Sequence, residues 1–147
     1  MSEEEAKALM RCWFDESNKG KAAALAVADR TCATNIVVHG IADSKGLKSY
    51  KRFLGEVYDA FPDKYAILDD MVAEGDKVAI RFTEIGTWKG AFMGIPPTNK
   101  KVTIRGIEID RVARGRFVEI WMVIDAPSMA QLGLVQVTEG KRRPTGR

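Results

Sequence analysis

The stretch from Gly106 to Gly133 constrains the fold most, because it has the pattern of two long strands joined by a tight turn. The turn is Ala113-Arg114-Gly115-Arg116, and Gly115 stands where a hairpin needs a residue that tolerates a positive φ. Side chains alternate between the two faces of a strand. The second strand therefore presents an apolar face made of Val118, Ile120, Met122 and Ile124. Its other face carries Phe117, Glu119, Trp121, Val123 and Asp125.

The two carboxylates on this mixed face are the first candidate site residues. A carboxylate that faces an apolar interior costs free energy unless it is paired or protonated. Strongly perturbed carboxylates of this kind gather at functional sites. Asp125 also precedes Ala126-Pro127, a pattern typical of a helix or turn start, so that a capping role stays open. Glu119 can instead form a salt bridge across the sheet with Arg81 or Arg105.

Length and charge limit the organisation and the partners of the chain. The 147 residues suit one domain, which we expect to span residues 1–137, followed by a basic, disordered tail over 138–147. Much of the net charge of +3 lies in that tail, so we expect no nucleic-acid partner. No apolar run approaches the ~18 residues of a membrane helix, and the N-terminus has no signal core. We therefore expect a cytoplasmic protein that does not enter membranes.

Two cysteines and a single histidine make metal chemistry improbable. Cys12 and Cys32 lie in stretches with a helical pattern, and an isolated pair in such a chain is more often free than bridged. With one histidine and no Cys-x-x-Cys motif, the sequence offers no ligand cluster for a metal. We expect neither a metal nor another cofactor.

The order of the predicted elements indicates an α+β fold. Three helices are expected over residues 2–18, 21–29 and 47–61, with a short strand over 34–40 between the second and third. Four strands follow, over residues 65–73, 77–87, 102–112 and 117–125. An irregular loop rich in glycine and proline lies between residues 86 and 101. Helices followed by consecutive antiparallel strands favour a curved sheet with the helices across its concave face, enclosing a pocket.

An ordered series of short motifs resembles one known family. The series is Phe61-Pro62-Asp63, Glu74-Gly75-Asp76-Lys77, Gly86-Thr87-x-x-Gly90, Gly94-Ile95-Pro96-Pro97-Thr98, Asp110-Arg111, Glu119-x-Trp121-x-x-x-Asp125 and Gln131-Leu132-Gly133. It resembles the SnoaL-like polyketide cyclases, also called ester cyclases, from about His39 to Gly133. The resemblance implies the cone-shaped α+β barrel shared with nuclear transport factor 2.

The resemblance also implies an activity and a set of site residues. Cyclases of this family close a ring by intramolecular aldol condensation without metal or cofactor, and an aspartate at the end of a strand acts as acid and base. That aspartate matches Asp125, the carboxylate that strand alternation had already selected. His39 is the second catalytic candidate, as a pocket residue that orients a ligand oxygen, although it can also be a hydrogen-bonded structural histidine. The predicted ligand-binding residues are Trp13, Tyr50, Arg81, Trp88, Glu119 and Trp121.

Two positions bear on the alternatives to a cyclase, because each departs from the pattern of a known family. The family often has Gly-Thr-His-x-Gly where this chain has Trp88, and an indole cannot carry a proton at neutral pH. A non-catalytic module that binds a small apolar molecule is therefore the alternative to a cyclase. Limonene epoxide hydrolases share the fold and use Arg-x-Asp on one strand, but here Arg81 is followed by Thr83. That substitution disfavours epoxide hydrolysis.

Helices on one side of a sheet leave its other side in need of cover. We predict that a homodimer forms through the open face. The residues expected there are Val118, Ile120, Met122, Ile124, Val78, Ile80 and Phe82.

Overall fold

A computed structural model describes residues 1–41 and 43–135 of the chain. Its elements in order are α1 (Glu3–Ser17), α2 (Lys21–Thr31), β1 (Cys32–His39), β2 (Ser44–Lys45), α3 (Leu47–Ala60), β3 (Tyr65–Glu74), β4 (Lys77–Thr87), β5 (Lys101–Ala113), β6 (Arg116–Ile124) and α4 (Ala126–Gln131). The predicted tail over residues 138–147, and the predicted domain end at residue 137, lie outside the described residues.

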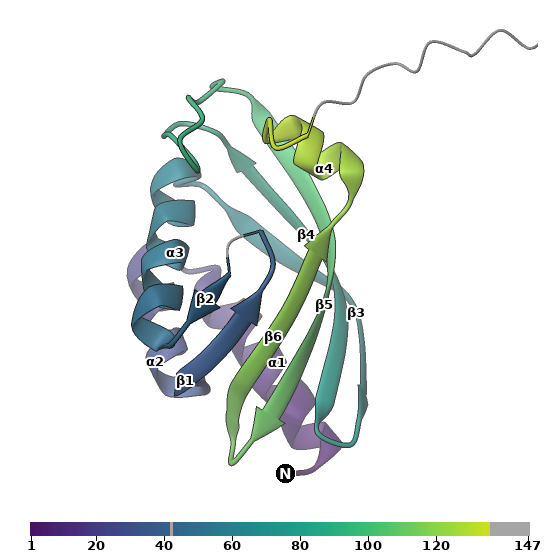
Figure 1. Cartoon of the computed structure of the whole chain (residues 1–147). Helices are drawn as coiled ribbons and strands as arrows, with labels where there is room; N and C mark the ends of the chain where they lie inside the picture. Colours follow the sequence, from purple (N-terminus) through teal and green to yellow (C-terminus); the bar gives the residue numbers. More distant parts are fainter. Residues whose placement is uncertain (42, 136–147) are drawn as a thin grey trace, which may run out of the picture.

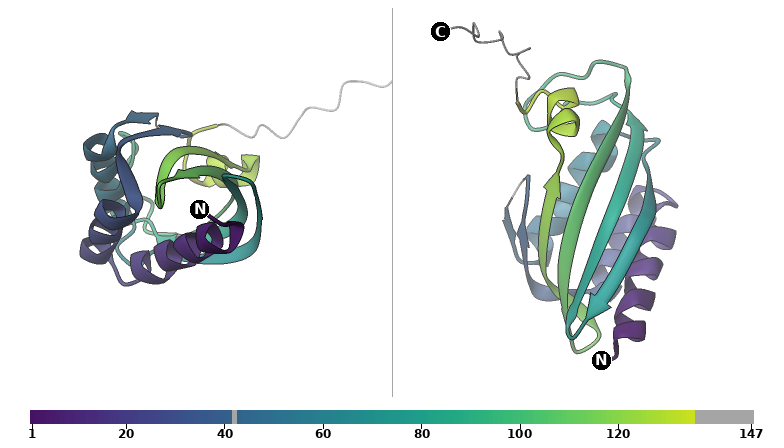
Figure 2. Two further views of the ribbon diagram at one scale, coloured as in Figure 1. Left: turned by 90° about the horizontal axis from the view of Figure 1, so that it is seen from below. Right: turned by 90° about the vertical axis from the view of Figure 1, so that its right-hand side faces the viewer.

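One curved sheet carries the fold, with strand order β2-β1-β6-β5-β4-β3. Neighbouring strands are antiparallel except β1 and β6, which run parallel. Helices α1, α2 and α3 lie on the concave side, and α4 lies at the end of β6 (Figure 1). Seen from below, the sheet and the helices surround an interior (Figure 2). The predicted α+β cone is confirmed, although the sheet is not closed into a barrel.

Local sequence signals determine where α1 begins and which of its faces is buried. Ser2 caps α1 by accepting a hydrogen bond from the backbone N–H of Glu5 at 3.1 Å. Acidic residues in its first turn complement the helix dipole. Met10 and Phe14, four residues apart on the same helix face, are buried against the sheet. The helix predicted from the serine cap and the glutamates is confirmed.

A bulge near the β5–β6 turn separates Phe117 from the other residues predicted to share its face of β6. Arg111 pairs with Glu119, whereas the next residue, Val112, pairs with Phe117, so Val118 is the extra residue on β6. Strict alternation holds only beyond the bulge. There, Ile120, Met122 and Ile124 turn toward the interior, while Glu119, Trp121, Val123 and Asp125 turn outward. The prediction that Asp125 and Glu119 face the interior is therefore wrong.

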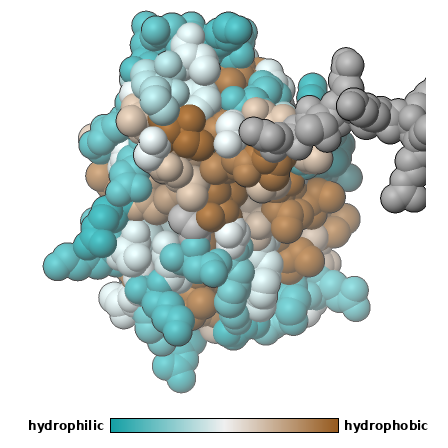
Figure 3. Space-filling view, turned by 45° about the horizontal axis from the view of Figure 1, so that its top comes forward, coloured by the Kyte–Doolittle hydropathy of each residue, from teal (hydrophilic) through white to brown (hydrophobic). Residues whose placement is uncertain are grey.

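No helix in the described part of the chain covers the outer face of the sheet (Figure 2), and exposed apolar side chains lie on this face. The residues first predicted for this face point inward instead, and Val78, Ile80 and Phe82 are at most 3% exposed. The side chains that occupy the outer face on β5 and β6 are Ile107, Ile109, Trp121 and Val123. In Figure 3 the brown apolar side chains extend from the middle of the view to its right-hand side, between teal polar regions.

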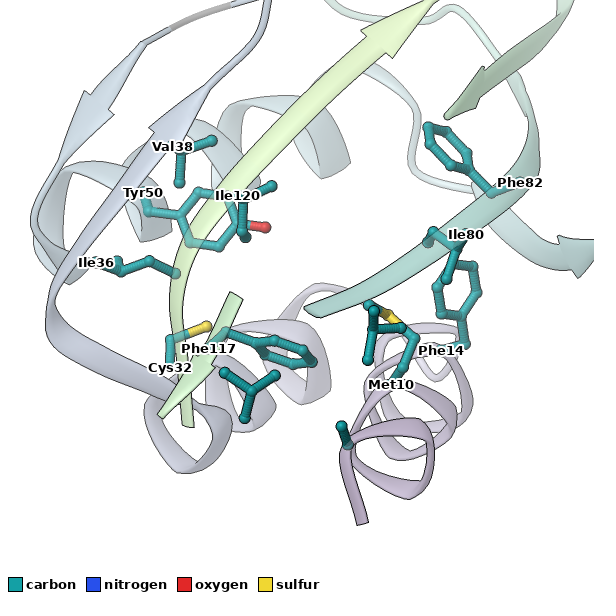
Figure 4. Packing of buried hydrophobic residues seen from close by; sticks show 13 residues of the cluster. Met10, Phe14, Cys32, Ile36, Val38, Tyr50, Ile80, Phe82, Phe117 and Ile120 are labelled. Carbon is teal, nitrogen blue, oxygen red and sulfur yellow. The ribbon is translucent and has the colours of Figure 1, made fainter. Parts of the chain in front are cut away.

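Two apolar clusters fill the ends of the interior. The first joins α1, β1 and the inner faces of β4 to β6, and includes Met10, Phe14, Ile36, Ile80 and Phe117 (Figure 4). The second lies under the loop between β4 and β5, and includes Phe61, Trp88, Phe92, Val102 and Leu132. Members of both clusters line a cavity between them.

Gly106 allows β5 to pack closely against the Phe82 ring of β4 and the backbone of β6. A Cβ atom at this position would lie 2.5 Å from the ring of Phe82 and 2.6 Å from the carbonyl oxygen of Val123. Any side chain there would displace the ring or the backbone, so glycine is required by space.

Both cysteines are free in the described structure, as predicted. Cys32 begins β1 rather than lying in a helix, and burial raises the pKa of its thiol to about 12. None of the helices in the described part of the chain is both long and apolar enough to cross a membrane.

Candidate functional site

A cavity of about 120 Å³ lies between the two clusters. That volume has room for about four water molecules. The helices α1 and α3 form one wall, and the inner faces of the sheet form the other. Its apolar lining includes Phe14, Val38, Phe53, Leu54, Val57, Phe61, Phe82, Ile104, Ile120 and Met122. Only a few polar side chains face it, as is usual in small-molecule sites.

The carboxyl group of Glu108 is one of these polar groups. Glu108 lies on the inner face of β5, opposite Ile80 on β4 and Met122 on β6. Asp110 is two residues further along the same face and is 2% exposed. The Oδ1 atom of Asp110 is buried without a hydrogen-bond partner among the described residues. Two acidic side chains therefore enter an apolar interior side by side.

Burial sets the protonation of this pair. It raises the pKa of Glu108 to about 7, although a hydrogen bond with Asp110 lowers it and the charge of Glu84 raises it further. Burial, together with the charge of Glu108, raises the pKa of Asp110 well above its usual range. Asp110 is then the member of the pair that stays protonated to higher pH, beside the Glu108 carboxyl group. Glu108 is left able to take up and release a proton near neutral pH.

Tyr50 supplies a hydrogen-bond donor in the same cavity. It extends from α3 and is 8% exposed, and its ring lies near Ile120 with the hydroxyl group turned toward the interior (Figure 4). Burial raises its pKa, followed by the charge of Glu108, so the phenol stays protonated. Trp13 also lines the cavity and stacks on Tyr50 with ring centroids 6.2 Å apart. The structure thus brings together these two predicted ligand-binding residues.

The ion pair of Lys64 and Glu84 lies on another part of the cavity wall. Lys64, just before β3, places its Nζ 3.4 Å from a carboxylate oxygen of Glu84 and 4.8 Å from the centroid of the Tyr58 ring. The side chains of Lys64 and Glu84 are 11% and 31% exposed. The hydroxyl of Tyr58 donates to the carbonyl oxygen of Ser17 at 2.7 Å, which fixes the ring.

Asp125 lies outside the cavity and caps α4. Its carboxylate accepts a hydrogen bond from the backbone N–H of Ser128 at 2.9 Å. This hydrogen bonding, helped by the charge of Arg105, lowers the pKa of Asp125. The prediction of a raised pKa inside the cone is therefore wrong, because Asp125 follows the outer face of β6 that carries Trp121 and Val123, and the start of α4 holds its carboxylate there.

His39 belongs to an outer cluster instead of the cavity. Its Nε2 lies 2.8 Å from a carboxylate oxygen of Glu119, and its ring stacks on Trp121 with centroids 5.5 Å apart. The other oxygen of Glu119 accepts a hydrogen bond from Arg111 at 3.3 Å. Glu119 thus forms the predicted kind of salt bridge, but with Arg111. His39, Glu119 and Trp121 lie together on the outer face, where they cannot touch a ligand in the cavity.

Arg81 and Trp88 are also outside the cavity. Arg81 lies on the outer face, 3.9 Å from Asp69, which accepts a hydrogen bond from Thr83 at 2.6 Å. Trp88 is 1% exposed in the second apolar cluster, and its Nε1 donates to the carbonyl oxygen of Gly90 at 2.8 Å. Trp88 therefore belongs to the packing of this cluster and does not line the cavity.

The alternation of residues along β5 held a signal for Glu108 and Asp110. The buried positions Val102, Ile104, Gly106 and Val112 share the even-numbered face of β5 with both carboxylates. The opposite face holds exposed Ile107 and Ile109. Apolar side chains outside and carboxylates inside reverse the usual pattern, and such a reversal is typical of a functional site.

Within residues 1–41 and 43–135, no three histidine, cysteine, aspartate or glutamate side chains gather closely enough to hold a metal ion. The predicted absence of a metal and of other cofactors stays a prediction.

Comparison with known proteins identifies relatives of this architecture. A family model described as SnoaL-like polyketide cyclase matches residues 6–132 of the chain. No curated protein sequence matches it. Among solved structures, AclR of Streptomyces galilaeus, described as a candidate hydroxylase, is 28% identical with a TM-score of 0.78. The match covers 92% of this chain and 100% of AclR.

Two further structures are described as candidate polyketide cyclases. IdmH of Streptomyces antibioticus is 28% identical with a TM-score of 0.71, over 86% of this chain and 97% of its own. A SnoaL-like protein of Jannaschia sp. CCS1 has a TM-score of 0.80 at 19% identity, over 91% of this chain and 94% of its own. At that identity the likeness concerns the fold alone.

Proposed function

Since the chain belongs to the family of SnoaL-like polyketide cyclases, we propose that it catalyses cofactor-free ring closure or isomerisation of an apolar carbonyl compound, with Glu108 as acid and base. The observation that carries the proposal is the Glu108 carboxyl group in an apolar cavity beside the buried Asp110. Asp125 has the opposite surroundings, as an outward helix cap, and so the acid–base role predicted for it passes to Glu108.

Intramolecular aldol closure needs one group that can both take and return a proton. The Glu108 carboxylate removes a proton from the carbon next to a carbonyl, and an enolate forms. The enolate carbon then bonds to a second carbonyl carbon of the same molecule, and Glu108 returns the proton to the new alkoxide oxygen. A carboxyl pKa of about 7 suits both steps near neutral pH.

Tyr50 and Asp110 support this chemistry from two sides. The protonated phenol of Tyr50 donates a hydrogen bond to the oxygen on which negative charge develops. Asp110 acts as a positioning residue, because its proton holds the Glu108 carboxylate in place. Trp13, stacked on Tyr50, keeps the ring oriented and offers an aromatic surface to the ligand.

Deuterium exchange tests the first step without knowledge of the natural substrate. The probe is 2-acetonaphthone, whose methyl protons exchange with D2O when they are removed as the enolate forms. The proposal predicts exchange by the wild-type protein above the buffer rate, followed by NMR, and saturation with increasing ketone. Binding of the ketone without any catalysed exchange would favour the alternative, a small-molecule-binding module without chemistry.

The apolar outer face of the sheet supports a homodimer. Ile107 pairs with Val123, and Ile109 with Trp121, so the four side chains form one contiguous area on neighbouring strands. Ile107 and Val123 are 54% and 67% exposed in the single chain. Contiguous exposed apolar area on a sheet marks an interface. A second copy of this chain is the proposed cover, and the cytoplasm stays the proposed location.

A further inference from the structure

The Lys64–Glu84 pair is a buried charged feature of the cavity that the proposed proton transfer does not use. Its lysine side chain is 11% exposed in a largely apolar wall. Removing two charges from water is costly, and two well-packed apolar residues often stabilise a protein at least as well. Stability alone therefore gives little reason for this pair to face the cavity.

The ammonium group of Lys64 has more hydrogen-bond donors than it has acceptors among the described residues. An ammonium carries three N–H donors, and among the described residues its one hydrogen-bond acceptor is Glu84, at 3.4 Å. The face of the Tyr58 ring lies on another side, 4.8 Å away. Burial by itself lowers the pKa of Lys64, but the charge of Glu84 and the contact with Tyr58 outweigh it, so the group stays charged.

The pair lies at some distance from the proposed proton carrier. Glu84 and Ile80 are on the same face of β4, four residues apart, and Ile80 is opposite Glu108. Four residues of strand correspond to about 13 Å. The cavity is therefore polar at two separate places, with apolar side chains such as Phe82 between them.

We propose that Lys64 is a second ligand-binding point, which donates a hydrogen bond to a carbonyl oxygen at the end of the substrate remote from Glu108. The inference rests on the proposed function, because it takes the cavity as the substrate site. It names the substrate class as an apolar molecule with oxygen groups at both ends. Glu84 holds the ammonium in place and balances its charge.

A pair of probes that differ by one acetyl group tests this role. The probes are 2-acetonaphthone and 2,6-diacetylnaphthalene, and their affinities are measured by calorimetry. The wild-type protein should bind the diketone about fivefold to tenfold more tightly, because the second oxygen reaches a charged donor. Lys64→Met should abolish this preference and leave the affinity for the monoketone within about twofold.

Matched variants separate charge recognition from damage to the fold. Lys64→Arg keeps the charge and the donors and should keep most of the preference. Lys77→Met removes an exposed lysine from the β3–β4 turn and should change neither affinity. If Lys64→Met does not fold, the double variant Lys64→Met/Glu84→Gln removes both charges together and allows the same comparison.

The outcomes distinguish this inference from the function on which it rests. Equal binding of both ketones by the wild-type protein, or an unchanged preference in Lys64→Met, overturns the role of Lys64 and leaves the acid–base role of Glu108 standing. If the wild-type protein binds neither ketone, the proposed function itself is contradicted, and the role of Lys64 is contradicted with it.

Discussion

Glu108 and Asp110 lie two residues apart on the inner face of β5, where burial raises the pKa of both carboxyl groups. The raised pKa values of such a pair affect the stability of the fold as well as the proposed chemistry. The folded protein holds a proton on Glu108 up to a pKa of about 7, whereas the unfolded chain releases it near 4.5. Between these values the folded state binds more protons than the unfolded state, so stability falls as pH rises.

Glu108→Gln should remove the contribution of Glu108 to this pH dependence, because an amide has no proton to lose, whereas the raised pKa of Asp110 keeps its own contribution. Between pH 4.5 and pH 8, the free energy of unfolding should therefore fall by about 3 kcal/mol less in the variant than in the wild-type protein. Urea unfolding at a series of pH values measures it. The same pH dependence in the variant and in the wild-type protein would contradict the assignment of the raised pKa to this residue.

Asp125 should matter for stability through its cap on α4. Asp125→Ala removes the acceptor for the Ser128 N–H and should lower the Tm by about 2–4 °C. Asn caps a helix about as well as Asp, so Asp125→Asn is the matched control and should melt close to the wild type. Calorimetry at pH 7 compares the three proteins. An alanine variant that melts like the wild type would rule out a capping contribution.

Gly106→Ala should destabilise the sheet under the cavity. The added methyl group would meet the Phe82 ring at 2.5 Å and the Val123 carbonyl oxygen at 2.6 Å. Overpacking of this kind costs about 1–3 kcal/mol, which denaturant unfolding can measure. Phe82→Leu in the same chain should restore only part of the loss, because the backbone oxygen remains. Full recovery in the double variant would mean that the ring alone requires glycine at this position.

A charge on the outer sheet face should separate the proposed dimer. Val123→Lys places an ammonium among Ile107 and its neighbours and should yield monomers in sedimentation at micromolar concentration. Met93→Lys is the matched control, because Met93 is 46% exposed in the loop between β4 and β5 and lies off the sheet. A wild-type protein that sediments as a monomer at every concentration would contradict the dimer.

Much of the architecture could be predicted from local patterns. The Ser2 cap, the apolar spacing of α1 and α3, and the turns at Gly75 and Gly115 each act over a few residues, so the sequence identifies them directly. Both glycines have the positive φ that a tight hairpin requires, at 59° and 76°. The family assignment, which rests on a series of such motifs, is confirmed by the match over residues 6–132.

Of the predicted site residues, Asp125, Glu119 and Trp121 were assigned to the wrong face of β6. One extra residue at Val118 separates them from the buried Phe117, with which they were expected to share a face. Nothing in the alternation of β6 itself marks the bulge, because both faces carry large apolar residues. Trp13 and Tyr50 were predicted to line the pocket, and both line the cavity, because α1 and α3 each present one face to it.

The most direct measurement of the central claim compares two carboxylates in one assay. Glu108→Gln and Asp125→Asn each remove one ionisable group and change few atoms, and deuterium exchange into 2-acetonaphthone is followed for both. Glu108→Gln should lower the catalysed exchange about a hundredfold or more, while Asp125→Asn should retain the wild-type rate. Loss of exchange in Asp125→Asn, with exchange intact in Glu108→Gln, would contradict the assignment of Glu108 as the acid and base.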